Sequence, residues 1–182
     1  KGTGNMKIGF VGCGNMAKAM IRGILDSKRV TAGEIIASAK SDTTREKISR
    51  ELGICVAQTN SEVVDFSDVV FLAVKPQYYE EVISEIRDCL TPEHMIVGIA
   101  PGKTLAWLEE KCGLPLKVVR LMPNTPAQVG EGMTGACAND RVTREDMEQI
   151  LAVTDSFGRT EVVPERLMDA VGAVSGCSPA YV

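Results

Sequence analysis

The sequence predicts a doubly wound α/β fold with a mostly parallel sheet, and three observations support this. A glycine-rich turn follows the first apolar run, Ile8–Val11. Apolar runs of strand length then alternate with segments of helical periodicity along most of the 182 residues. The run Val69–Val74 is apolar at every position, which indicates a strand covered on both faces, as in a parallel sheet.

The glycine-rich turn, Gly12-Cys13-Gly14-Asn15-Met16-Ala17, joins the predicted strand Lys7–Val11 to a predicted helix from about Asn15 to Leu25. Strand, glycine turn and helix in this order are the context of a dinucleotide-binding fingerprint of the Rossmann type. Gly12 permits the tight turn, Gly14 lets the backbone approach a pyrophosphate, and the small Ala17 lets the helix pack closely on the strand. The N–H groups at the start of the helix would face the phosphates. The alternative is a tight turn that binds no ligand.

The remaining elements follow from apolar runs, periodicity and capping signals. Further strands are predicted at Glu34–Ser38, Ile54–Ala57, Val69–Val74, Met95–Ile99, Lys117–Leu121, Met133–Cys137 and Arg159–Val163. Further helices are predicted at about Thr43–Leu52, Asn60–Phe66, Tyr78–Leu90, Leu105–Lys111 and Thr143–Phe157. The pairs Thr43/Glu46 and Thr143/Asp146 have the spacing of a capping box.

The domain boundary is predicted near Pro164, where the composition changes. Residues 6–163 would form the dinucleotide-binding domain, and residues 1–5 look like an expression remnant before a native Met6. Residues 164–182 have a helical pattern but are too few to form a core alone. We expect them to be the start of a second, helical region.

Composition argues against several classes of protein. The net charge of −4 and the lack of a long basic run argue against a nucleic-acid partner. No apolar run approaches the roughly 20 residues of a membrane span. The six cysteines are scattered and His94 is the sole histidine, so no metal site is expected. Reduced thiols in a cytoplasmic protein are predicted rather than a disulfide framework. Cys13 stands out because a helix N-terminus would lower its pKa.

The residues after the second strand bear on which dinucleotide fits. Enzymes that use NAD place an acid there, about 20 residues past the glycines, to hold the ribose 2′-hydroxyl. This chain instead reads Ser38-Ala39-Lys40-Ser41, and these hydroxyls with one cation suit a 2′-phosphate. NADPH is therefore the preferred cofactor, with NADH possible because Asp42 follows closely enough to reach a ribose hydroxyl. The alternative for Lys40 is a solvated loop lysine.

Ligands in open α/β sheets bind outside the carboxyl ends of the strands, where the strand order reverses. Three loops are expected there: one at Asn60, one at Ala73-Val74-Lys75-Pro76, and one at Ala100-Pro101-Gly102. Lys75 would stabilise anionic groups of a ligand, or would contribute only its backbone.

The loop Met122-Pro123-Asn124-Thr125-Pro126 follows another strand and combines two prolines with short polar residues. It would present donors to a small polar substrate, or form a structural turn. Arg120 would pair with a carboxylate or act as a structural cation. His94 is expected to be remote from the site, and Trp107 and the tyrosines are expected to pack in the core or on the surface. No catalytic acid is assigned.

With these residues assembled, the chain resembles pyrroline-5-carboxylate reductase. The resemblance is collinear over essentially all of Met6–Val182. It depends on the segments Ile8–Ala17, Ala73–Gln77, Met122–Pro126 and Val174–Val182. The first segment is shared by many reductases, and the last two are far more specific to the family.

The resemblance implies NAD(P)H-dependent reduction of L-1-pyrroline-5-carboxylate to L-proline, the last step of proline biosynthesis. Motif matching places Gly12–Ala17, Ser38, Lys40, Asn60 and Ala73–Pro76 at the cofactor. It places Pro123, Asn124 and Thr125 beside the nicotinamide and substrate. The alternatives are a reductase of another imine or carbonyl compound and a non-catalytic dinucleotide-binding module.

Two departures from the family pattern bear on activity. The family usually reads Ser-Gly-Ser-Gly-Pro where this chain has Ser175-Gly-Cys177-Ser178-Pro179. Members of the family also continue into a helical domain, which dimerises and completes the substrate pocket. The resemblance therefore implies a homodimer or higher homo-oligomer at full length, and this chain is expected to be a truncated form.

Overall fold

The computed structural model of the chain describes residues 6–123, 133–156 and 158–168. Within these ranges eight strands form one sheet in the order β3-β2-β1-β4-β5-β6-β7-β8. The strands are β1 (Ile8–Val11), β2 (Ile35–Ser38), β3 (Cys55–Ala57), β4 (Val69–Leu72), β5 (Met95–Gly98), β6 (Lys117–Pro123), β7 (Met133–Ala138) and β8 (Arg159–Val162). The α-helices are α1 (Asn15–Ser27), α2 (Asp42–Leu52), α3 (Asn60–Phe66), α4 (Tyr79–Ile86), α5 (Leu105–Cys112) and α6 (Arg144–Thr154).

The sheet reverses its strand order between β1 and β4. The chain first builds outward through β2 and β3, and then returns to place β4 on the other side of β1. The strands β1 to β6 are parallel; β7 is antiparallel to β6, and β8 is parallel to β7. This arrangement confirms the predicted doubly wound, mostly parallel fold.

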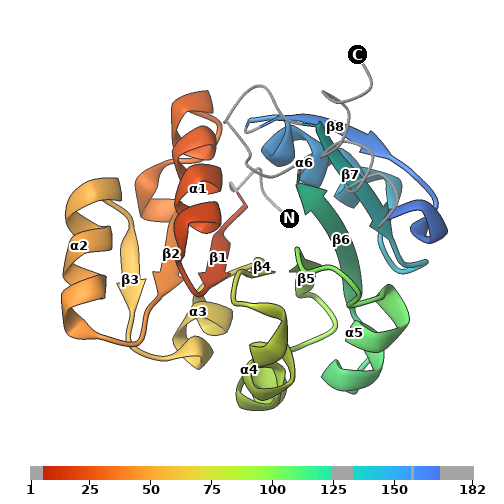
Figure 1. Ribbon diagram of the computed structural model, residues 1–182, viewed down its shortest axis with the longest axis horizontal. Coiled ribbons are helices and arrows are strands. Elements are labelled where there is room, and N and C mark those ends of the chain that lie inside the picture. Colours follow the sequence, from red (N-terminus) through yellow and green to blue (C-terminus); the bar gives the residue numbers. More distant parts are fainter. Residues whose placement is uncertain (1–5, 124–132, 157, 169–182) are drawn as a thin grey trace.

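Helices cover both faces of the sheet (Figure 1). One hydrophobic core packs α1, α2 and α6 against one face, and the other packs α3, α4 and α5 against the opposite face. Strand β4 contributes to both cores, with Val69 and Phe71 in the first and Val70 and Leu72 in the second. All four side chains are buried, as expected of a strand in the middle of such a sheet.

Several predicted boundaries are wrong. Strand β4 ends at Leu72 rather than Val74, and β6 continues to Pro123, so Met122 belongs to a strand and not to a loop. The segment predicted as one helix from Tyr78 to Leu90 is α4 flanked by two 3₁₀ helices, Pro76–Tyr78 and Arg87–Cys89.

Helix α2 is capped differently from the prediction. Ser41 is its N-cap, and the Ser41 hydroxyl accepts a hydrogen bond from the Thr44 backbone N–H at 3.1 Å. The predicted capping box at Thr43 and Glu46 is therefore wrong, because the helix starts earlier than the prediction placed it. The second predicted box is confirmed, because Thr143 and Asp146 exchange both hydrogen bonds at the start of α6.

The last described element is a 3₁₀ helix, Glu165–Leu167, which follows Pro164. Its Glu165 carboxylate accepts hydrogen bonds from the Leu105 backbone N–H at 2.6 Å and from Arg120 at 3.2 Å. This short element is thus tied to α5 and β6. Among the helices in the described ranges, none has the length and apolar character to span a membrane.

Candidate dinucleotide site

A cavity of about 650 Å³ lies at the carboxyl edge of the sheet, where the strand order reverses. Four loops meet there, because each directly follows the carboxyl end of β1, β2, β3 or β4. The lining residues are Gly12, Cys13, Gly14, Ser38, Ala39, Lys40, Thr44, Gln58, Thr59, Asn60, Ala73, Val74, Lys75, Tyr78, Glu81, Val82 and Glu85. Open α/β sheets bind their ligands at this position.

The glycine turn after β1 has the two features that its sequence requires. Gly12 has φ +90°, and a Cβ there would lie 2.8 Å from Val74 Cγ1, so only glycine fits without strain. Gly14 is the N-cap of α1, and a Cβ there would meet no heavy atom within 4 Å. The space beside Gly14 is therefore open to a ligand.

The N-terminus of α1 is available to an anion. No side chain caps it, and its first turn carries no acidic residue. By contrast, α2, α3, α5 and α6 each have a Ser or Thr side chain that accepts a hydrogen bond from the first turn. The uncapped N–H groups and the positive end of the helix dipole are features that favour an anion.

A chain of hydrogen bonds crosses the cavity floor and holds the glycine turn. The Gly12 N–H donates to the Ser38 hydroxyl at 3.0 Å, and that hydroxyl donates to Asn60 Oδ1 at 2.7 Å. Asn60 Nδ2 in turn donates to a Glu85 carboxylate oxygen at 2.7 Å. The chain links the ends of β1, β2 and β3 to helix α4, and Ser38 is only 4% exposed. The Ser38 hydroxyl therefore supports the turn from within the protein.

The loop after β2 carries Lys40 at the cavity. Its ammonium nitrogen lies 5.1 Å from the ring centroid of Tyr78, which follows β4. Asp42 does not line the cavity; its carboxylate pairs with Arg45, which also donates to the Ala39 carbonyl. The Asp42 carboxylate, which was predicted to reach a ribose hydroxyl, thus forms an ion pair with Arg45 inside α2.

The loop after β4 brings Ala73, Val74 and Lys75 to the cavity. Tyr79 anchors this loop from below: it is fully buried, its hydroxyl donates to the Leu72 carbonyl, and it accepts from the Ile99 N–H at 3.0 Å. Burial raises the pKa of Tyr79, so this hydroxyl stays protonated. Tyr79 thus packs in the core, whereas Tyr78 is 42% exposed and lines the cavity.

Other predicted cofactor residues lie near the cavity without lining it. Asn15 and Met16 begin α1, and Ala17 is buried in the core as close helix–sheet packing requires. Pro76 begins the 3₁₀ helix ahead of α4, and the loop 100–102 does not reach the cavity.

The predicted substrate segment falls largely outside the described residues. Pro123 ends β6, while Asn124 and Thr125 lie outside the ranges that the structure describes. The departure from the family pattern at Cys177 and Ser178 also lies outside them.

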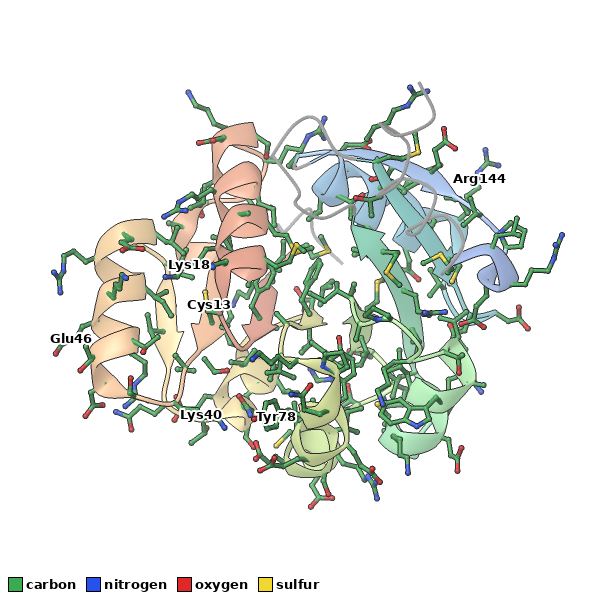
Figure 2. All side chains as sticks on the ribbon, in the orientation of Figure 1. Cys13, Lys18, Lys40, Glu46, Tyr78 and Arg144 are labelled. Atoms are coloured by element: carbon green, nitrogen blue, oxygen red, sulfur yellow. The ribbon has the colours of Figure 1, made fainter. Side chains whose placement is uncertain are left out.

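The expectation for Cys13 is corrected by its surroundings. Burial raises the pKa of the Cys13 thiol to about 11, despite the opposing influence of Lys18 and Arg22. Figure 2 shows Cys13 and Lys18 beside helix α1. The loss of hydration outweighs the helix terminus, so Cys13 is a neutral thiol near pH 7.

Sequence reasoning missed one face of α4. Tyr78, Glu81, Val82 and Glu85 all line the cavity, and their spacing of three, four and seven residues places them on one helical face. The helix begins shortly after β4, so this periodicity next to a switch-point strand was the signal available. Thr44, Gln58 and Thr59 were also missed, although each lies close to a strand end that had been selected.

Two polar residues considered in the sequence analysis, His94 and Arg120, lie away from the cavity. His94 Nδ1 accepts from the Thr91 N–H, so its Nε2–H donates to the Val64 carbonyl at 3.0 Å, and the ring joins α3 to the loop before β5. Arg120 is 2% exposed and pairs with Glu165 of the same chain, in keeping with a structural cation. Neither residue lines the cavity.

The fold, the glycine turn and the switch-point cavity define the class of a dinucleotide-binding domain of the Rossmann type. Comparison with known proteins narrows this class. The family model described as NADP oxidoreductase, coenzyme F420-dependent, matches residues 7–102, which is more than half of the chain.

Closer relatives identify the family. A pyrroline-5-carboxylate reductase of Escherichia coli is 42% identical over 176 residues, covering 97% of this chain and 65% of the relative. A pyrroline-5-carboxylate reductase structure from Coxiella burnetii matches with a TM-score of 0.90 at 30% identity, covering 98% of this chain and 66% of that one. The Plasmodium falciparum pyrroline carboxylate reductase with NADP bound matches with a TM-score of 0.85 at 30% identity, covering 99% and 66%.

The chain belongs to the pyrroline-5-carboxylate reductase family, and it spans about 65% of the length of the curated relatives it matches.

Proposed function

We propose that the cavity binds a pyridine nucleotide, with NADPH preferred over NADH. The uncapped start of α1 and the free space at Gly14 suit the pyrophosphate. Lys40 offers a cation after β2, where a 2′-phosphate would lie, and the carboxylate of Asp42 is held by Arg45. The crystal structure of the Plasmodium falciparum relative, which is 30% identical to this chain, has NADP bound.

The proposed reaction is the reduction of L-1-pyrroline-5-carboxylate to L-proline, as the family name of the relatives indicates. The observation that carries this proposal is the 42% identity to the Escherichia coli enzyme across 97% of this chain. When bound, the nicotinamide supplies a hydride to the C=N carbon of the imine, and a proton on the nitrogen completes the amine. A protonated iminium is the better hydride acceptor.

The residues of this chain would bind and orient the reactants. The glycine turn would hold the pyrophosphate, and the segment from Ala73 to Lys75 would place the nicotinamide half through its backbone groups. The substrate would lie beyond β6, next to Pro123, Asn124 and Thr125. We assign no general acid within the chain.

The partner is proposed to be a second copy of the same protein, as the family resemblance predicts. Light scattering of the protein in solution would test this, and a monomer would contradict it.

Activity is tested by following the loss of NADPH absorbance with L-1-pyrroline-5-carboxylate, with proline identified by chromatography. The six-membered cyclic imine homologue serves as the comparison substrate. Faster turnover of the five-membered imine is the expected result, and faster turnover of the homologue would favour a different imine reductase. Calorimetric binding of NADPH without turnover of either imine would favour the alternative of a non-catalytic dinucleotide-binding module.

A further inference from the structure

Lys40 and Tyr78 meet across the rim of the cavity. They come from the loops after β2 and β4, two strands that both neighbour β1 and do not touch each other. The Lys40 ammonium nitrogen lies 5.1 Å from the centroid of the Tyr78 ring, within the range of a cation–π contact. Figure 2 shows both side chains at the same edge of the molecule, between α2 and α4.

The kind of partner determines what Lys40 can still do. Four other lysines in the described part of the chain form ion pairs with carboxylates, including Lys111 with Glu80 at 3.0 Å and Lys117 with Asp146 at 2.9 Å. Among the described residues, Lys40 forms no such ion pair, although Glu81 lines the same cavity. An aromatic ring attracts a cation through its quadrupole and leaves its full charge in place. Lys40 is therefore held in position and still able to bind an anion.

Tyr78 is one of the exposed large hydrophobic side chains of the described residues. Its neighbour Tyr79 is fully buried, whereas Tyr78 is 42% exposed and faces the cavity from the start of α4. Because the Tyr78 ring already restricts the Lys40 side chain, Lys40 loses less conformational entropy when it binds a ligand.

We propose that Tyr78 is a specificity-determining residue that positions Lys40 for the 2′-phosphate of NADPH. The inference depends on the proposed cofactor site and adds a residue to it. NADPH and NADH differ only in the 2′-phosphate, so the ratio of their affinities reports the groups that contact this phosphate, Lys40 among them. Loss of the ring should lower this ratio, because Lys40 would then have to be ordered by the phosphate alone.

The test is calorimetric titration of the protein with NADPH and NADH in matched variants. Tyr78→Leu removes the ring and should lower the NADPH-to-NADH affinity ratio by about two- to fivefold. Tyr78→Phe keeps the ring and should retain the ratio of the wild type. In a Lys40→Met background, Tyr78→Leu should have no further effect on the ratio.

A matched control exists outside the cavity. Lys103 lies 4.3 Å from the centroid of the Trp107 ring, and Trp107→Leu should leave the ratio unchanged. A wild type that binds both nucleotides equally, or neither, would overturn the proposed preference and this inference together. A wild type that prefers NADPH, with a preference that survives Tyr78→Leu, would overturn this inference alone. If Tyr78→Leu weakens the binding of NADPH and NADH equally, this inference is also overturned. That result would indicate that the Tyr78 ring contacts the adenine, which both nucleotides share.

Discussion

Ser38→Ala tests how the glycine turn is held. The substitution removes the hydroxyl that accepts from the Gly12 N–H at 3.0 Å and donates to Asn60 Oδ1 at 2.7 Å. An intramolecular hydrogen bond contributes about 1 kcal/mol to stability, and a buried group left without a partner costs about 1–3 kcal/mol. Water in the cavity can reach Gly12, so the cost should fall near the lower end, at about 1–2 kcal/mol. The midpoint of thermal unfolding should then fall by roughly 2–8 °C.

The effect on binding separates two roles of Ser38. If the hydroxyl supports the turn, NADPH and NADH should both bind about fivefold more weakly, because each needs the same pyrophosphate site. If the hydroxyl instead contacts the 2′-phosphate, as the sequence suggested, NADPH alone should lose affinity. Urea unfolding measures the free energy of unfolding, and calorimetric titration measures the nucleotide affinity of the same protein preparation.

Thr143→Ala is the control for a general loss of stability. The Thr143 hydroxyl caps α6 away from the cavity, and its loss should cost about 1 kcal/mol without changing nucleotide affinity. An unchanged unfolding midpoint and unchanged affinities in Ser38→Ala would refute the supporting role of the hydrogen-bond chain.

The two glycines of the turn should respond in opposite ways. Gly14→Val should abolish binding of both nucleotides and cost no more than about 1 kcal/mol of stability, because a Cβ there meets no protein atom within 4 Å and the main cost is a poorer N-cap of α1. Gly12→Ala should lower the unfolding midpoint, given its φ of +90° and the nearby Val74; the reverse pattern would contradict the site. Alkylation of Cys13 near pH 8, followed by peptide mass spectrometry, should be about 100-fold slower than for a thiol of ordinary pKa, because its pKa is about 11. Its rate should rise about tenfold per pH unit up to that pKa, and rapid labelling near neutral pH would show that the thiol is not buried in solution.

The amino-acid sequence by itself determined the fold class and predicted the strand ends at which the candidate site lies. Apolar runs and their alternation with helical periodicity are local properties, and they predicted the strands to within about two residues. The conformational freedom of Gly12 and the small size of Ala17 are likewise properties of single residues, and the structure places both as the fingerprint requires. The strand ends that surround the cavity could be named because parallel strands share one carboxyl edge.

Only the tertiary structure decided what the side chains at that edge do. The hydrogen bonds from Gly12 to Ser38, from Ser38 to Asn60 and from Asn60 to Glu85 join residues 26, 22 and 25 positions apart. No local pattern encodes such contacts, because they depend on how α3 and α4 pack against the sheet. The raised pKa of Cys13 has the same origin, since burial is a property of the assembled core. The sequence thus predicted which strand ends surround the candidate site. The hydrogen-bond partners and the burial of its side chains depend on tertiary packing.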